Sequence, residues 1–484
     1  MRPEVFTLRR IQSPTQNFRG SARGMHMKKR IRSPIKRMHS KSVWARTLRR
    51  ISWAGLEIRR KEMDILDDLR NGEETVWLNP DRRHVVPREK IDGYGFARMK
   101  AAQMRFMRFM PWVEKAFPET AARKGVIESG LLEITNMKDR MNAEGAGVTG
   151  RVLLKDDAHL PIAGSVKARG GIHEVLAIAE KTAQNADMLW PTENYGKVYS
   201  DAFREFYSRY TIQVGSTGNL GISIGRTAAR LGFKVTVHMS SDAKEWKKEL
   251  LRSEGVTVVE YEGDYSEAVA NGRKQSEMDE NSFFIDDENS EDLFFGYSTA
   301  AMRVSVQLRK MNILVDSEHP LFLYLPCGVG GAPGGITFGF RQLYGDNVHC
   351  FFAEPVQAPC LTLGMATGKG ADICVQDIGL DGRTNADGLA VGRPSGFVCR
   401  MMKPLMSGSF TVFDERMADW QEKLRELEGI SVELSACAGF RGLFEVENEG
   451  TAFSDYLRRE KIAETMEQAT HIVWATGGGL MPDA

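Results

Sequence analysis

The sequence predicts an α/β fold in which mostly parallel sheets are flanked by helices. From residue 145 onward, short β-branched or apolar runs alternate with amphipathic stretches of helical length, as they do when crossover helices join parallel strands. The chain has 484 residues, 42% of them hydrophobic, which is enough to bury one large or two medium cores. No stretch approaches about 18 consecutive apolar residues, so the sequence does not predict a membrane-spanning protein.

The elements follow from the spacing of apolar residues along the chain. Residues 62–69 and 91–117 have helical spacing, and we expect the second helix to break near Pro111 and to end before Pro118. The alternation that follows predicts strands at residues 150–154, 211–214, 234–239, 257–261, 322–325, 349–354 and 472–474. It predicts helices at residues 166–185, 219–231, 243–254, 265–279 and 334–344.

The net charge of +1 hides an asymmetry along the chain. Residues 1–60 contain 17 Lys and Arg and only two acidic residues, so their net charge is +15 and that of residues 61–484 is −14. The basic segment is rich in Ser and has no long apolar run. We therefore expect a disordered leader ahead of an acidic catalytic body.

Three explanations of the leader stay open, in decreasing order of preference. The start codon could be placed too early, since Met25, Met27, Met38 and Met63 offer later starts. The segment could instead be an organelle transit sequence, which is typically rich in Arg and Ser and poor in acidic residues. A nucleic-acid-binding arm is the least favoured, because no aromatic interleaving or folded binding motif accompanies the charge.

The cysteines indicate the redox compartment. They are Cys327, Cys350, Cys360, Cys374, Cys399 and Cys437, all in the C-terminal third. They form no C-x-x-C pair and match neither a disulfide framework nor a zinc site. We therefore expect reduced thiols and a cytoplasmic location.

The candidate chemistry lies where predicted strands meet helices. The first junction, residues 153–171, places Lys167 at the start of a helix. The positive end of the helix dipole and reduced solvation both favour the neutral amine, which is the form that attacks an aldehyde. A solvated lysine at a helix start is the simpler interpretation of this junction alone, so the argument for Lys167 depends on the other three junctions.

Two further junctions are rich in glycine. Residues 214–221 form a turn whose backbone N–H groups, with the hydroxyls of Ser216 and Thr217, could hold a small carboxylate. Residues 326–335 have so many glycines that backbone N–H groups around an anion such as phosphate are the better explanation. Pro333 replaces the third glycine of the dinucleotide fingerprint, and no G-x-x-x-x-G-K-[ST] sequence occurs, so we expect a phosphate monoester.

The fourth junction, residues 473–479, ends an apolar strand at Thr476, whose hydroxyl could bond a ring nitrogen. In this order the four junctions resemble the tryptophan-synthase-like (fold type II) pyridoxal phosphate enzymes. More narrowly, seven segments resemble the bacterial-type D-serine dehydratase family among the serine/threonine dehydratases. They are residues 161–171, 215–221, 246–248, 283–290, 350–355, 386–393 and 474–479. The resemblance runs from about residue 61 to the end, and residues 1–60 have no counterpart in it.

The resemblance implies how pyridoxal 5'-phosphate would be held. Lys167 would form the internal aldimine, Asn219 would hydrogen-bond the phenolic oxygen and Thr476 would face the pyridine nitrogen. The phosphate would lie on the backbone of Gly328, Val329, Gly330 and Gly331. A hydroxyl at the ring nitrogen leaves the ring largely unprotonated and a weaker electron sink, which favours elimination.

The implied reaction is the dehydration and deamination of D-serine to pyruvate and ammonia. The substrate carboxylate would lie on Ser216, Thr217 and Gly218. With that carboxylate fixed, the Cα hydrogen of a D-amino acid points away from Lys167, so Thr217 is a second candidate catalytic residue beside Lys167. Bonding the substrate carboxylate is an equally good role for Thr217.

The same resemblance implies a domain division. Residues 61–205 and 310–484 would form a large domain that binds the cofactor, and residues 206–309 a small domain. Related enzymes often bind a monovalent cation, which Glu354 and the segment around Asp387 could frame, although a surface or helix-capping role suits each equally well. The sequence identifies no metal ligands, and we expect a monomer or small homo-oligomer with neither membrane nor nucleic-acid partners.

Other functions compete with this interpretation. A nucleotide-dependent oxidoreductase shares the alternating strands but needs G-x-G-x-x-G and an acidic residue about 20 residues later, and the glycine fingerprint is missing. A non-catalytic nucleic-acid-binding protein would leave Lys167 and the glycine turns unexplained. Within the lyases, the alternative is a dehydratase or ammonia-lyase for another small amino acid such as D-threonine.

Overall fold

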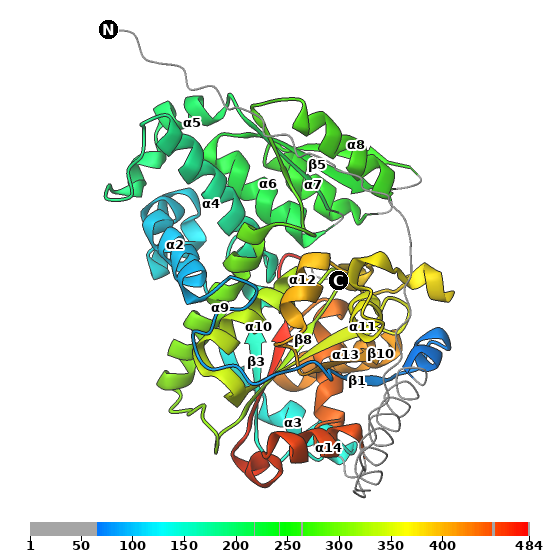
Figure 1. The fold of residues 1–484 in the computed structure, drawn as a ribbon. Coiled ribbons are helices and arrows are strands. Elements are labelled where there is room, and N and C mark those ends of the chain that lie inside the picture. The colour runs from blue at the N-terminus through cyan, green and yellow to red at the C-terminus, as the bar shows by residue number, and fades with distance from the viewer. Residues whose placement is uncertain (1–64, 217, 242, 263–264, 448–450, 483–484) are drawn as a thin grey trace, which may run out of the picture. The chain divides into compact units, whose positions relative to one another are not determined.

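The computed structural model describes residues 65–216, 218–241, 243–262, 265–447 and 451–482 (Figure 1). The leader predicted for residues 1–60 and the candidate residue Thr217 lie outside the described residues. Within them the chain forms one seven-stranded sheet and one four-stranded sheet.

The larger sheet has the strand order β1-β10-β9-β8-β11-β3-β2. Its parallel strands are β10 (Gly408–Val412), β9 (Val348–Pro355), β8 (Leu321–Pro326), β11 (Thr470–Ala475) and β3 (Arg151–Asp156). The edge strands β1 (Val76–Leu78) and β2 (Leu131–Glu133) pair antiparallel with β10 and β3. The expectation of a mostly parallel sheet is confirmed.

The central strands of this sheet are buried on both faces. In β8 and β11, Leu323 and Ile472 lie opposite each other and belong to one apolar cluster, while Phe322 and Val473 belong to the other. Every residue of β8, β9 and β11 is buried. This is why these strands read as continuous apolar runs rather than as alternating ones.

The smaller sheet is entirely parallel, with the order β6-β5-β4-β7. Its strands are β4 (Thr211–Gly215), β5 (Lys234–Ser240), β6 (Thr257–Tyr261) and β7 (Ser282–Ile285), joined by α6 (Asn219–Leu231), α7 (Glu245–Ser253) and α8 (Tyr265–Glu277). Figure 1 shows these helices beside the sheet. The α/β architecture with a larger and a smaller sheet is thus confirmed, and the domain boundaries at residues 206 and 309 stay predictions.

Four helices pack against one another beside the sheets. They are α2 (Phe96–Ala116), α4 (Lys167–Asn185), α9 (Glu291–Lys310) and α10 (Gly331–Tyr344). The other helices are α3 (Thr135–Ala143), α5 (Asp201–Tyr207), α11 (Cys360–Ala366), α12 (Gly396–Met402), α13 (Asp414–Glu428) and α14 (Ala452–Glu460). Helix α9 packs against α10, α4 and α2. No helix among the described residues is long and apolar enough to cross a membrane.

The break expected near Pro111 was wrong, because α2 continues through this residue. Proline has no N–H to donate to the carbonyl of Met107, one turn earlier. Met107 is 49% exposed, so water can bond that carbonyl instead. Phe109 and Trp112 on either side of Pro111 are buried, and their packing holds the helix together.

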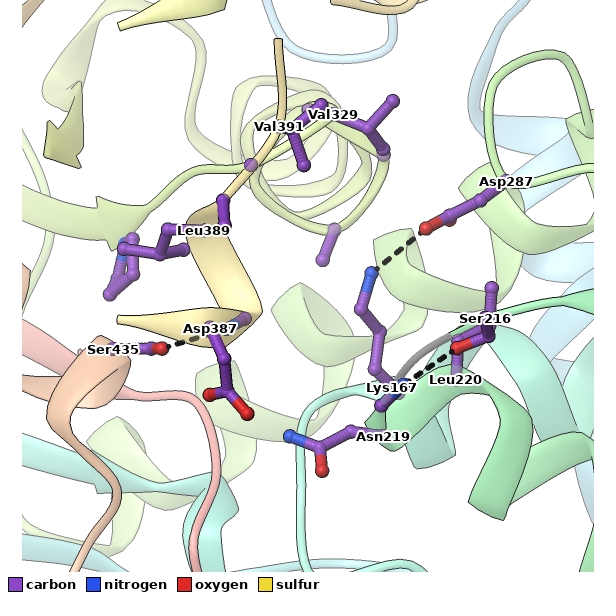
Figure 2. Close-up of a pocket in the computed structure, with 18 of the residues that line it drawn as sticks. Lys167, Ser216, Asn219, Leu220, Asp287, Val329, Asp387, Leu389, Val391 and Ser435 are labelled. Carbon is purple, nitrogen blue, oxygen red and sulfur yellow. Dashed lines mark hydrogen bonds and ion pairs between the residues drawn. The ribbon is translucent and has the colours of Figure 1, made fainter. Parts of the chain in front are cut away.

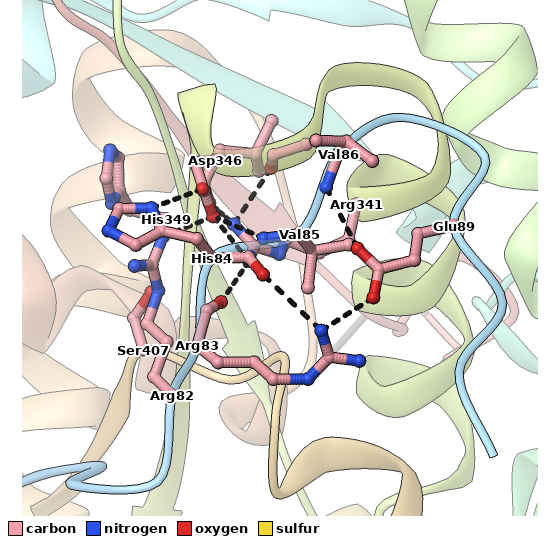
Figure 3. Close-up of polar contacts among 12 residues, drawn as sticks. Arg82, Arg83, His84, Val85, Val86, Glu89, Arg341, Asp346, His349 and Ser407 are labelled. Atoms are coloured by element: carbon pink, nitrogen blue, oxygen red, sulfur yellow. Dashed lines mark hydrogen bonds and ion pairs between the residues drawn. The ribbon is translucent and has the colours of Figure 1, made fainter.

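At the amino end of β9, opposite the strand ends considered below, a polar cluster fixes the segment after β1 (Figure 3). The buried Arg341 of α10 donates to Asp346 Oδ1 at 2.7 Å, and the same oxygen accepts from the Val85 N–H at 3.2 Å. His84 Nδ1 meets Asp346 Oδ2. Burial raises the pKa of Asp346, but Arg341 and these hydrogen bonds outweigh it and hold the pKa below its ordinary value. Asp346 therefore ties the segment to the sheet as a carboxylate.

Candidate active site

Strand ends from both sheets surround a cavity of about 740 Å³ (Figure 2). The predicted residues that line it are Lys167, Ser216, Gly218, Asn219, Gly328, Val329, Gly330, Gly331 and Thr476. Thr217 lies outside the described residues. Carboxyl ends of parallel strands are the usual place for a ligand site in α/β proteins, and a cavity of this size suits a small cofactor with its substrate. The fold thus brings the four junctions together.

Lys167 is the first residue of α4, and its side chain points into the cavity. Its Nζ donates to Asp287 Oδ2 at 3.2 Å and lies 5.9 Å from the centre of the Tyr297 ring. The residue before it, Val166, donates its N–H to the carbonyl oxygen of Thr476 at 2.7 Å. The start of α4 is therefore tied directly to the end of β11.

Asp287 is a cavity residue to which the sequence argument assigned no role. It follows β7 and is 25% exposed as a side chain, and among the described residues its buried Oδ1 has no hydrogen-bond partner. The neighbouring Asp286 is the residue that pairs with Arg273, at 3.2 Å. The position of Asp287 just after a parallel strand of the smaller sheet is the signal that could have identified this residue.

The turn after β4 uses the Ser216 side chain in its own structure. Ser216 Oγ accepts from the N–H groups of Gly218 at 3.2 Å and Gly221 at 3.0 Å, at the start of α6. The lone pairs of the oxygen are therefore engaged, and the hydroxyl proton is what Ser216 can offer to a carboxylate. The expected contact with a substrate carboxylate is compatible with this arrangement.

Asn219 opens α6 and reaches across to a carboxylate that the sequence argument did not identify. Its Nδ2 donates to Glu433 Oε1 at 2.9 Å and Oε2 at 3.2 Å. Burial raises the pKa of Glu433, and Lys247 opposes this by its charge. No sequence motif marks Glu433, which lies far along the chain, just before the 3-10 segment Leu434–Phe444.

The glycine loop after β8 opens α10, which begins at Gly331. The first N–H groups of a helix have no acceptor within it, and the helix dipole adds positive potential there. Gly330 has φ +104°, a left-handed conformation, and a Cβ on it would lie 2.9 Å from Leu361 Cδ1. A side chain is thus excluded at Gly330 both by the backbone and by the space.

Thr476 and the residues after it lie at the end of β11. Thr476 lines the cavity, as predicted for a hydroxyl that faces a ring nitrogen. The next residue, Gly477, packs so closely that a Cβ on it would lie 2.2 Å from Glu433 Oε1 and 2.8 Å from Asn219 Nδ2. Glycine at this position therefore leaves the room for the contact between Glu433 and Asn219.

Two lysines at the start of α7 meet an aspartate beside the cavity, where Asp387 opens the 3-10 segment Asp387–Leu389. Lys247 Nζ donates to Asp387 Oδ2 at 3.0 Å, and Lys244 Nζ is 3.5 Å from the same oxygen. Burial raises the pKa of Asp387, but the two ammonium groups outweigh it and hold the pKa below its ordinary value. The two lysines outweigh the charge of Asp387 and so place a positive charge near the start of α6.

A buried charge cluster lies under the start of α4. Arg169 donates from Nε to Asp157 Oδ2 at 2.6 Å and from Nη2 to Asp157 Oδ1 and Glu128 Oε1, each at 2.7 Å. Lys155 Nζ donates to Glu128 Oε1 at 2.8 Å, and Trp474 Nε1 donates to Asp157 Oδ2 at 2.8 Å. Each charged side chain in it is at least nine-tenths buried. The cluster connects β3, α4 and β11 beneath the cavity.

The residues considered for a cation site have other partners. Glu354 accepts from the N–H groups of Leu361 and Thr362 in the first turn of α11, each at 2.8 Å, which is the helix-capping alternative. Burial raises the pKa of Glu354 to about 7 against these hydrogen bonds. Among the described residues, no group of three or more His, Cys, Asp and Glu side chains could hold a metal ion. The monovalent cation stays a prediction.

The cavity residues fit pyridoxal phosphate. A lysine amine stands at one wall, and the start of α10 offers N–H groups and a positive dipole to a phosphate at another. Gly328 in this loop is closely packed, since a Cβ on it would lie 3.1 Å from Val391 Cγ2. The unpaired Oδ1 of Asp287 leaves one buried acceptor for a ligand.

Comparison with known proteins points the same way. Residues 134–455 match the family model described as pyridoxal-phosphate dependent enzyme. A Bacillus cereus (strain 03BB102) protein named probable D-serine dehydratase is 50% identical over 429 residues, which cover 88% of this chain and 95% of that protein. A Vibrio campbellii protein of the same name is 52% identical over 425 residues, covering 87% and 95%.

Solved structures share the fold at much lower identity. Diaminopropionate ammonia lyase from Escherichia coli is 18% identical with a TM-score of 0.62, and the match covers 84% of this chain and 94% of that chain. A second structure of that lyase, with a TM-score of 0.61, is a complex with D-serine. At this identity the likeness establishes the fold, which agrees with the type expected from the sequence.

Proposed function

Because this chain belongs to the family of pyridoxal-phosphate-dependent enzymes, we propose that it is a carbon–nitrogen lyase that converts D-serine to pyruvate and ammonia. The strongest support is that a helix-start lysine, a glycine loop and a strand-end threonine line one cavity. The relatives that are half identical over most of this chain bear the name of that activity.

Each part of the cofactor would be held by a different element. Lys167 would bind its carbonyl carbon, Asn219 would donate to its phenolic oxygen, and Thr476 would meet its ring nitrogen. Its phosphate would lie on the N–H groups of Gly328, Val329, Gly330 and Gly331. When bound, pyridoxal phosphate supplies an electron sink for bonds to the Cα of an amino acid.

The substrate carboxylate would bind at the turn that opens α6. Ser216 and Gly218 line the cavity, and the Ser216 hydroxyl can donate its proton to an anion there because its oxygen already accepts from Gly218 and Gly221. A Cβ on Gly218 would lie 3.5 Å from Lys247 Nζ, so an ammonium group stands beside the turn and favours an anion there.

Dehydration needs a base that removes the Cα proton and an acid that protonates the departing hydroxyl. Lys167 Nζ and Asp287 Oδ2, 3.2 Å apart, can exchange a proton, so this pair can protonate the departing hydroxyl and is one of two candidates for the base. The hydroxyl leaves as water, and the released enamine takes up water again to give pyruvate and ammonia. Thr217 stays a second candidate base on the opposite side of the substrate.

Thr217→Val distinguishes these bases. If Thr217 removes the proton, the variant still binds D-serine but exchanges its Cα hydrogen with solvent deuterium far more slowly. Exchange at the wild-type rate with unimpaired binding would return the role to Lys167 and Asp287.

The proposed function is tested by assaying the purified protein, loaded with pyridoxal phosphate, for 2-oxo acid and ammonia. We expect pyruvate from D-serine and much slower turnover of L-serine and D-threonine. Preferred turnover of D-threonine would replace the substrate but keep the lyase. No 2-oxo acid from any of the three by a cofactor-loaded protein would refute the proposed lyase activity.

Assembly and location are part of the proposal. We propose a cytoplasmic enzyme that works as a monomer or small homo-oligomer. The cysteines support a reducing compartment, since all six are free thiols and five of them are buried. Size-exclusion chromatography with light scattering measures the oligomeric state.

A further inference from the structure

Glu433 occupies an unusual place for a buried carboxylate. It is 6% exposed, it lines the cavity, and both of its side-chain oxygens accept from Asn219 Nδ2, at 2.9 and 3.2 Å. It comes from the part of the chain that packs on the larger sheet, while Asn219 opens α6 beside the smaller sheet. The contact therefore links the two walls of the cavity.

The surroundings of Glu433 hold its carboxylate against Asn219. The Glu433 N–H donates to the carbonyl oxygen of Gly477 at 2.9 Å, which fixes the residue to the segment after Thr476. A Cβ on Gly477 would lie 2.2 Å from Glu433 Oε1. The room for the carboxylate thus depends on a glycine next to the residue expected at the ring nitrogen.

The chemistry of the pair decides which end of the Asn219 amide faces the carboxylate. An ionised carboxylate only accepts hydrogen bonds, whereas an amide presents two N–H donors on one side and an oxygen acceptor on the other. The amide nitrogen must therefore turn toward Glu433, which leaves its second N–H for a partner elsewhere. Without the carboxylate, the amide could turn over and present its oxygen instead.

We propose that Glu433 is a positioning residue that keeps the Asn219 amide turned so that its nitrogen donates to the cofactor. This inference rests on the proposed function, in which Asn219 donates to the phenolic oxygen of pyridoxal phosphate. Glu433 itself does not need to touch the cofactor or the substrate.

The groups around Glu433 decide how pH acts on it. Lys244 before α7, Lys247 within it and Asp387 act on it by charge, and Asn219 of α6 donates to it. Cys437, a thiol whose pKa burial raises, stays neutral beside it. Burial raises the pKa of Glu433 above its ordinary value. As the pH falls through this pKa, the carboxyl gains a proton, becomes a donor as well, and no longer dictates the orientation of Asn219.

A double-mutant cycle tests the inference without depending on turnover. The full-length protein is freed of cofactor and titrated with pyridoxal phosphate, with the dissociation constant read from the quenching of tryptophan fluorescence. Glu433→Gln should raise this constant about tenfold in the wild-type background, as expected for losing a hydrogen bond to a charged group. In the Asn219→Ala background it should change the constant less than about twofold, because the amide to be oriented is gone.

Glu447→Gln is the matched control. Glu447 is also a largely buried glutamate with a raised pKa, and it accepts from the N–H and hydroxyl of Thr149, away from the cavity. This variant should leave the dissociation constant unchanged in both backgrounds. If Glu433→Gln does not fold, Glu433→Asp, which keeps the charge but retracts it from Asn219, enters the same cycle.

The titration at several pH values gives a second readout. The wild-type constant should rise as the pH falls through the pKa of Glu433, and the constant of Glu433→Gln should rise less. Equal effects of Glu433→Gln in both backgrounds, or equal pH dependence of the two proteins, would overturn this inference alone. A wild-type protein that binds no pyridoxal phosphate would overturn the proposed function, and this inference with it.

Discussion

Lys167 and Arg169 stand two residues apart in the first turn of α4, and their charges are handled in opposite ways. Arg169 is 3% exposed and makes charged hydrogen bonds to both oxygens of Asp157 and to Glu128. The Lys167 side chain is 22% exposed, and among the described residues it has one ion pair, with Asp287 at 3.2 Å. The charged groups of the buried cluster have all their hydrogen-bond partners, whereas the charged groups of the cavity do not.

The two acidic partners differ in the same way. Asp157 accepts on both oxygens, with Ser129 and Trp474 adding to Arg169. Asp287 has a buried oxygen with no hydrogen-bond partner among the described residues. An unpaired buried oxygen is costly unless a ligand satisfies it. We infer that the fully hydrogen-bonded cluster around Asp157 stabilises the fold, and that the pair of Lys167 and Asp287 takes part in the reaction.

The sharpest test of this contrast is Lys167→Ala. Only an amine at this position can bind the carbonyl carbon of the cofactor and release it again. We expect a folded protein with turnover reduced by more than about 10⁴-fold, measured as pyruvate formed from D-serine. Urea unfolding should change little, because the Lys167 side chain is partly exposed and its ion pair with Asp287 is long. Near-normal pyruvate formation would contradict the role of Lys167.

Asp157→Asn breaks the saturated side of the comparison. It puts an amide where both oxygens accept from charged donors and leaves Arg169 undercompensated in the core. We expect a loss of about 3 to 5 kcal/mol in the free energy of unfolding, measured in urea on the cofactor-free protein. The exposed pair Asp67 and Arg70 is the control, since Asp67→Asn should cost less than about 1 kcal/mol. Equal losses in the free energy of unfolding from Asp157→Asn and Asp67→Asn would show that the buried cluster contributes no more to stability than an exposed ion pair.

Asp287→Asn removes the proton-accepting partner of Lys167 while keeping its shape. We expect kcat for D-serine to fall about 10²-fold, the size of one general acid–base contribution. Stability should change little, because burying a neutral amide costs less than burying a carboxylate and this offsets the loss of the ion pair with Lys167. Wild-type kcat in this variant would assign proton transfer to Lys167 or Thr217 alone.

Removal of residues 1–60 should have the smallest effect. The deletion takes away 17 Lys and Arg side chains but none of the alternating strands and helices. Activity per folded molecule and the dissociation constant of pyridoxal phosphate should stay within twofold, or about 0.4 kcal/mol, of the full-length values. A truncated protein that folds but binds no cofactor would make the leader part of the site.

The sequence predicted the alternating part of the fold closely. Helix α6 has the predicted bounds, and β4, β5, β6, β8, β9 and β11 differ from prediction by two residues at most. Their signals are strong because each element has one buried face or is buried throughout between turns. Strands β1, β2, β7 and β10 were missed; β1 and β2 are only three residues long, and β7 is four.

Helix α9 was missed for a different reason. It packs between α10, α4 and α2, and buried residues such as Phe294, Phe295, Tyr297 and Ser298 lie all around it. Every residue from 293 to 301 is buried, and a stretch without a polar face gives no amphipathic period to detect. The contact between α9 and α10 also gives Gly335 a packing role, since a Cβ on this residue would lie 2.4 Å from the Phe294 carbonyl oxygen. Gly335 had been predicted to belong to the anion-binding loop.

The site divides along similar lines. Residues in glycine-rich junctions, such as Lys167, Asn219 and Gly330, could be found because strand, turn and helix follow one another in the chain. Glu433 could not, because its role depends on side chains brought together from distant segments. Asp287 was missed because the strand before it, β7, was not predicted. Local patterns predict where a ligand binds, and tertiary contacts decide which groups act on it.

The position of β11 has a consequence for synthesis of the protein. This strand follows all the others in the chain, yet it lies in the middle of the larger sheet, between β8 and β3. Until residues 470–475 leave the ribosome, β8 and β3 have unpaired edges, which are open to pairing with another chain. The threonine at the end of β11 arrives with this last strand, so closing the core and completing the cofactor site are one event late in folding.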